Sequence, residues 1–157
     1  MSEIAFESWA RPLAFIHALS AIVLVGALTH GSVFLLLSTR KAREGNIRRA
    51  ARFWPVILPA LFLTLLSGSL AYPTYRIRTR AEFLDRHHPL TAGFFDLKEN
   101  YAAIVMVLII ACWLLRREPS GSPARTFLHD PLFHLASTLA WVSFVCGLWV
   151  TLHRGIG

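Results

Sequence analysis

One uncharged stretch constrains this chain more than any other feature. Residues 12–37 read PLAFIHALSAIVLVGALTHGSVFLLL and contain no aspartate, glutamate, lysine or arginine. As a helix, these 26 residues would rise about 39 Å, which exceeds the roughly 30 Å of a bilayer's hydrocarbon core. The stretch therefore predicts a helix that crosses a membrane.

Three further apolar stretches repeat this pattern. The predicted spans cover about residues 12–37, 53–72, 100–116 and 132–152, so that the chain, residues 1–157, forms a single membrane domain. The 73–99 connection is predicted to be a long extracytoplasmic loop, and Asp130 with Pro131 predicts the start of the last helix. We therefore expect an all-α fold, an integral membrane antiparallel four-helix bundle.

The charge distribution agrees with a membrane protein. A net charge of +7 would suggest a nucleic-acid partner in a soluble chain. Here the basic residues flank the apolar spans, where they set topology and meet anionic headgroups, so we expect the lipid bilayer as their partner and no nucleic acid. The loop between the first two spans is predicted to be cytoplasmic, with both termini extracytoplasmic, because it carries six basic residues: Arg40, Lys41, Arg43, Arg48, Arg49 and Arg52.

Histidines inside the spans are the candidate functional residues, because imidazole in hydrocarbon needs a protein, cofactor or water partner. His17 and His30 lie in the first span, His134 lies in the fourth, and His153 directly follows the outer end of the fourth. In an antiparallel bundle, His17 falls near the level of His153 and His30 near that of His134. Such pairs predict axial metal ligands of b-type haem between facing helices. In the alternative interpretation, each histidine bonds to a carbonyl or hydroxyl of a neighbouring helix.

Helical geometry favours one haem over two. His17 and His30 are 13 residues apart, or about 20 Å along a helix. The same 13 steps rotate the side chain by about 220°, so the two imidazoles point to different faces. Two haems stacked between the same pair of helices would need His17 and His30 to point to the same face of the first helix.

The 73–99 connection carries three arginines at alternate positions. Arg76, Arg78 and Arg80 alternate with Ile77 and Thr79, which is typical of an extended segment. We expect these arginines to bind haem propionates or to dock a partner. The simpler interpretation has them contact lipid headgroups and pair with acidic residues of the same connection.

Two further groups in this connection have candidate roles. Asp96, Lys98 and Glu99 lie at the start of the third span, where they are candidates for lining a quinone pocket. His87 and His88 are candidates for a surface metal or proton-uptake site, although adjacent side chains on an extended segment point apart.

The run YPTYRIRTRAEFLDRHHPLTAGFFDLKENYAA, residues 72–103, is similar to a segment of small bacterial integral membrane proteins. This resemblance implies the bacterial cytoplasmic (inner) membrane and no particular activity. The histidine-bearing four-helix layout also resembles the membrane b-type cytochromes that anchor or serve redox complexes, which implies haem, electron transport and a redox partner. The chain departs from the cytochrome b subunits of quinol-oxidising complexes, whose paired histidines recur on one face of each of two helices.

These observations predict a membrane electron-transfer subunit that binds b-type haem between helices one and four. We expect it to serve a respiratory or other redox complex, with quinone as a further cofactor. An accessory subunit is favoured over a stand-alone enzyme, because no catalytic triad or metal-protease spacing is visible. Two alternatives stay open: a cofactor-free structural or assembly subunit of a larger membrane complex, and a small histidine-lined transporter or metal-handling protein.

Overall fold

The computed structural model describes residues 4–37, 43–119 and 122–153. Short elements at the ends of the long helices are a 3-10 turn η1 (Glu7–Trp9), α2 (Arg43–Ala51), a π-helix η2 (Tyr75–Leu84) and α4 (Asp85–His87). The long helices are α1 (Ala10–Leu36), α3 (Trp54–Thr74), α5 (Pro89–Leu115) and α6 (Pro123–His153).

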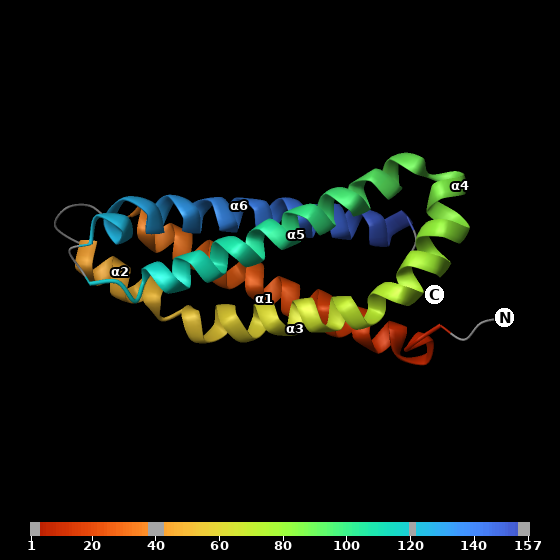
Figure 1. The fold of residues 1–157 in the computed structure, drawn as a ribbon, viewed down its shortest axis with the longest axis horizontal. Coiled ribbons are helices and arrows are strands. Elements are labelled where there is room, and N and C mark those ends of the chain that lie inside the picture. The colour runs from red at the N-terminus through yellow and green to blue at the C-terminus, as the bar shows by residue number, and fades with distance from the viewer. Residues whose placement is uncertain (1–3, 38–42, 120–121, 154–157) are drawn as a thin grey trace.

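The described elements form an all-α antiparallel bundle, as predicted. Four helical segments are long and apolar enough to cross a membrane. Figure 1 shows α1 beside α3 and α5 beside α6, and contact between α1 and α6 joins the two pairs. The α4 end of the bundle holds the start of α1, η2, α4, the start of α5 and the end of α6. The opposite end, called the α2 end, holds the end of α1, α2, the end of α5 and the start of α6.

The centre of the bundle packs through a glycine and aromatic rings. Phe133 of α6 is 2% exposed, and a Cβ atom on Gly31 of α1 would come within 2.8 Å of its ring. Trp54 of α3 meets the same ring edge-on, at 5.9 Å between centroids. Because lipid tails are as apolar as the protein interior, close packing of this kind is what holds membrane helices together.

Large apolar side chains cover the outside of the long helices. Phe15 on α1, Phe62 on α3 and Val107 on α5 are 70%, 64% and 59% exposed. A soluble monomer rarely exposes contiguous apolar surface on this scale, whereas a bilayer core accepts it. The exposed surface and the four apolar helices together support a multi-pass membrane protein.

The connection between the second and third spans is helical rather than a loop. Helix α3 continues through Pro73, and η2 follows it directly. Buried side chains recur every five residues, at Thr74, Thr79 and Leu84, which matches the i→i+5 repeat of a π-helix. The prediction of an extended segment at 76–80 is therefore wrong. The arginines at alternate positions suggested the two-residue period of a strand, whereas burial in this segment repeats every five residues.

Helices α5 and α6 both begin at a proline, earlier than predicted. Helix α5 starts at Pro89 rather than near residue 100, and α6 starts at Pro123 rather than at Asp130. Proline suits the first turn because its missing N–H has no helical partner there. Asp130 is therefore not a helix cap; it lies within α6, with its carboxylate 2.9 Å from Nδ1 of His129.

Candidate functional site

His17 is partly buried in the bundle and bonds to the neighbouring helix. Its Nδ1 atom lies 2.8 Å from the carbonyl oxygen of Thr64 in α3. Since a carbonyl only accepts, Nδ1 carries the proton, and Nε2 of the neutral imidazole keeps its lone pair. A Cβ atom on Gly68 would come within 2.9 Å of Nδ1, so the ring packs directly on the α3 backbone. Helices α1 and α3 thus hold this imidazole in one tautomer and one position.

Hydroxyl groups extend the polar contact between α1 and α3. The Thr64 hydroxyl oxygen lies 2.9 Å from that of Ser20 and 2.7 Å from the carbonyl of Ala60. The Ser20 hydroxyl donates to the His17 carbonyl at 3.0 Å. Interhelical hydrogen bonds in a membrane contribute roughly 1 kcal/mol each. We call His17, Ser20, Thr64 and Gly68 the His17 cluster; it fixes the register of α1 against α3.

Lys98 brings a positive charge to this region from α5. Its alkyl chain packs on α6, where a Cβ atom on Gly147 would meet the Lys98 Cε atom at 3.3 Å. The ammonium lies 5.8 Å from the ring centroid of Phe95, and it acts electrostatically on His17 and Glu99. Among the described residues, no carboxylate lies within ion-pair distance of this ammonium. It is therefore suited to donate a hydrogen bond to an oxygen atom of a bound molecule.

Arg80 joins η2 to α5. Its two terminal nitrogens lie 2.5 and 3.0 Å from the two carboxylate oxygens of Asp96, a bidentate pair. Its Nε atom lies 3.7 Å from the Asp85 carboxylate, and its guanidinium carbon lies 5.8 Å from the Phe95 ring centroid. These contacts hold the beginning of α5 against η2.

Arg78 and Arg76 differ in their contacts. Arg78 donates to the Glu7 carboxylate at 2.9 Å and to the Glu82 carboxylate at 3.1 Å. The Arg76 guanidinium lies 6.0 Å from the Tyr72 ring centroid. Pairing with acidic residues, the simpler interpretation, is thus observed for Arg78 and Arg80. In the described part of the chain, Arg76 forms no ion pair.

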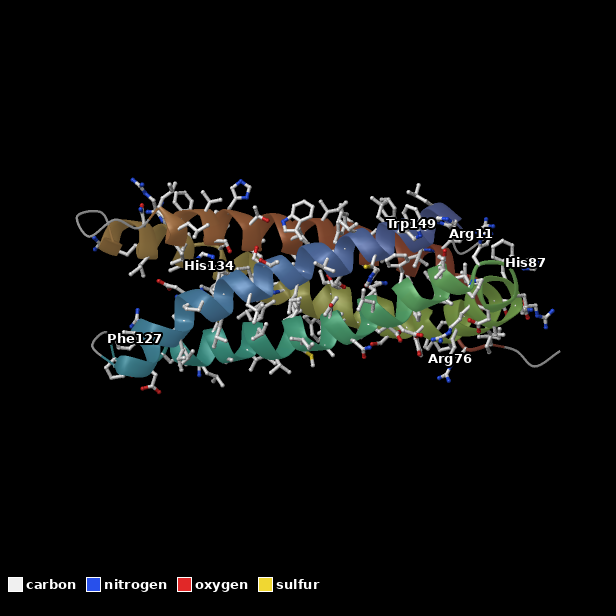
Figure 2. The ribbon with its side chains drawn as sticks, turned by 90° about the horizontal axis from the view of Figure 1, so that it is seen from above. Arg11, Arg76, His87, Phe127, His134 and Trp149 are labelled. Atoms are coloured by element: carbon white, nitrogen blue, oxygen red, sulfur yellow. The ribbon has the colours of Figure 1, made fainter. Side chains whose placement is uncertain are left out.

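His30 and His134 lie at one level of the bundle, but they are turned away from the α1–α6 contact. Their sequence neighbours Gly31 and Phe133 touch across α1 and α6. One residue step turns each side chain by about 100° from that contact. His30 is exposed, its ring 5.8 Å from that of Phe53, whereas His134 is partly buried on α6 (Figure 2).

His153 lies at the α4 end, where its ring contacts His88 and Trp149. The ring centroids of His88 and His153 are 5.5 Å apart. The Nδ1 atom of His153 donates to the Trp149 carbonyl at 2.9 Å, within its own helix. The structure therefore brings together two histidines that are 65 residues apart in sequence and that the sequence did not pair.

Sequence reasoning identified His17 but not its partners. The signal available on α3 was the patch Ser67-Gly68-Ser69, whose small residues predict close contact with another helix. Such a patch does not identify which helix approaches it. Lys98 was predicted at the start of a span as a candidate for lining a quinone pocket, but it lies within α5, which already begins at Pro89.

Within the described ranges, no group of three or more His, Cys, Asp or Glu side chains is placed to hold a metal ion. Cys112 and Cys146 are both buried free thiols. Comparisons with protein-family models, curated proteins and solved structures find no match for this chain. The His17 cluster and the charges around it are therefore the features of the described structure that bear on function.

Proposed function

We propose that this protein is an electron-transfer subunit of the bacterial cytoplasmic membrane that binds b-type haem through His17. The observation that carries the proposal is the hydrogen bond from His17 Nδ1 to the Thr64 carbonyl. Histidines that bind metals through Nε2 are commonly oriented by such a bond from the other ring nitrogen. When bound, the haem would supply a one-electron iron couple.

The propionates of a haem would need a basic partner at the α4 end of the bundle, where η2 carries Arg76, Arg78 and Arg80. Arg76 is the arginine best suited to a propionate, because Arg78 and Arg80 already hold carboxylates. In this proposal His17 is the residue that would hold the haem iron, and ligand roles for His30, His134 and His153 stay sequence predictions.

Lys98 supports a place for quinone in the same proposal. Its ammonium lies in the half of the bundle nearer the α4 end, and its charge acts on His17. There it would donate a hydrogen bond to a quinone carbonyl oxygen. Electrons would pass between that quinone and other membrane subunits of a redox complex.

A dithionite-reduced minus air-oxidised spectrum of the detergent-purified protein, produced with ample haem, tests this proposal. We expect α and Soret bands from the wild-type protein and their loss in His17→Ala. His87→Ala is the matched control, because this histidine is exposed, bonds to the Phe83 carbonyl in its own segment and has no part in the proposed haem site. A flat wild-type spectrum, or equal loss in both variants, contradicts the proposal.

The two alternatives predict different results from the same preparation. A structural or assembly subunit would give a flat spectrum and would co-purify with its complex after mild solubilisation. A histidine-lined transporter would give a flat spectrum and solute-dependent uptake in proteoliposomes. The interhelical hydrogen bond of His17 is compatible with either alternative, because it also serves packing.

A further inference from the structure

We propose that His88 and His153 form a binding site for a divalent transition-metal ion at the α4 end of the bundle. The site lies apart from the His17 cluster and does not depend on haem binding. Its ligands come from two places, the junction of α4 with α5 and the end of α6.

His88 lies between α4 and α5, and its backbone dihedral angles are not helical. Its φ of −141° and ψ of 64° interrupt the helical run, as expected for a residue before Pro89. Its N–H donates to the Leu84 carbonyl at 2.8 Å, and its own carbonyl accepts the N–H of Thr91 at 2.9 Å. Because Leu84 is fully buried, this junction is anchored although the His88 side chain is exposed.

Aromatic contacts place His153 opposite this junction. Its ring lies 4.7 Å from the ring of Trp149, which in turn lies 6.0 Å from the ring of Phe94 on α5. Trp149 and His87 are labelled at the same end of the bundle in Figure 2. The end of α6 is thereby held against the start of α5, which keeps His153 beside His88.

The geometry of the two rings fits shared coordination. The ring centroids are 5.5 Å apart, with an interplanar angle of 69°. Two imidazoles that bind one tetrahedral ion, with metal–nitrogen distances near 2.0–2.1 Å, hold their centroids roughly 5 Å apart. Since Nδ1 of His153 donates to a carbonyl, Nε2 of the neutral ring keeps the lone pair that a metal requires. No hydrogen bond from the described residues occupies the ring nitrogens of His88.

The ligand type selects the class of ion. Imidazole nitrogen favours Cu²⁺, Zn²⁺ and Ni²⁺, whereas Ca²⁺ and Mg²⁺ prefer oxygen ligands. Two protein ligands leave the remaining positions to water, so an exposed site of this kind would exchange its ion readily. A bound ion would link the α4–α5 junction to the end of α6.

Competition against a chromophoric chelator tests this site, with Cu²⁺ and Zn²⁺ as probes on the full-length protein freed of any polyhistidine tag. We expect His88→Gln and His153→Gln each to weaken binding at least tenfold. His87→Gln is the matched control: this histidine is adjacent and exposed, but its ring stacks on Phe83 at 5.0 Å, and no contact joins it to His153 among the described residues. Binding that survives both substitutions, or that falls equally in the control, overturns the proposal.

A second measurement needs no substitution. The electron paramagnetic resonance spectrum of the Cu²⁺-loaded wild-type protein counts nitrogen ligands through their hyperfine splitting, and two imidazoles are expected. One nitrogen, or none, overturns the site even if a variant fails to fold. The haem spectrum of His88→Gln keeps the two proposals separate: this exposed histidine has no part in the proposed haem site, so we expect its spectrum to match the wild-type spectrum whether or not metal binds.

Discussion

At the scale of single residues, the position of the His17 ring depends on Gly68, because a side chain at position 68 would displace it. A Cβ atom there would come within 2.9 Å of Nδ1 and 3.0 Å of Cε1. We expect Gly68→Ala to cost about 1–3 kcal/mol through overpacking, offset by up to about 1 kcal/mol of helix propensity. It should also displace the imidazole from the Thr64 carbonyl and reduce any haem bands. Thermal unfolding in detergent and the difference spectrum measure these two effects.

Gly26→Ala is the control for this prediction. Gly26 lies within α1, nine residues from His17, and a Cβ atom there would meet nothing within 4 Å. Helix propensity alone should leave the melting temperature unchanged or slightly higher. If both alanine variants melt at the same temperature, the close contact between Gly68 and His17 does not contribute to the stability of the protein.

The sequence could show that His17 needs a partner, but not which partner it has. A histidine in hydrocarbon requires a polar or metal neighbour, and this requirement depends only on local hydropathy. The choice of the Thr64 carbonyl depends on which α3 residue faces position 17. That register is set by Ser20, Thr64 and Gly68 together, so it is a property of two packed helices.

At the scale of elements, the Arg80–Asp96 pair fastens η2 to α5. Removing it with Asp96→Asn should weaken this contact by about 1 kcal/mol at most, because both side chains are partly solvent-exposed. We expect faster amide exchange in η2 and in the first turns of α5, measured by hydrogen–deuterium exchange. Asp85→Asn is the control, since its carboxylate lies 3.7 Å from Arg80 and should matter less. Faster exchange in the control than in Asp96→Asn would refute the assignment.

The start of a helix was predicted correctly where an apolar run begins at once, and it was missed where charged residues separate the start of the helix from the apolar run. The predicted start of the second span near residue 53 is confirmed, because α3 begins at Trp54 with Pro55 in its first turn. Pro89 carries the same signal for α5, but the charged residues that follow it, such as Lys98 and Glu99, favoured a loop. The sequence pattern does not predict the π-helix, because a five-residue burial repeat matches neither the 3.6-residue period of an α-helix nor the two-residue period of a strand.

At the scale of the whole molecule, apolar length determined the fold class. The four predicted spans correspond to the four membrane-length helical segments of the structure, because roughly 20 consecutive apolar residues have few stable arrangements other than a spanning helix. The pairing of α1 with α3 and of α5 with α6 follows from the short connections between them. The contact between His88 and His153 could not be predicted from the sequence, because it depends on how the end of α6 packs against the α4–α5 junction.

The distribution of basic residues predicts how the bundle is oriented in the membrane. Basic residues gather at the α2 end, where Arg48 and Arg49 lie on α2 and Arg52 follows it, so we expect that end to face the cytoplasm. A single cysteine in a variant lacking Cys112 and Cys146 should react with an impermeant maleimide in intact bacterial cells when placed at His87. A cysteine at Arg52 should react only after lysis, because both side chains are exposed but at opposite ends of the bundle. The reverse pattern would place the α4 end, with its arginines and its paired histidines, in the cytoplasm, where the ions that reach His88 and His153 would be those of the cell interior.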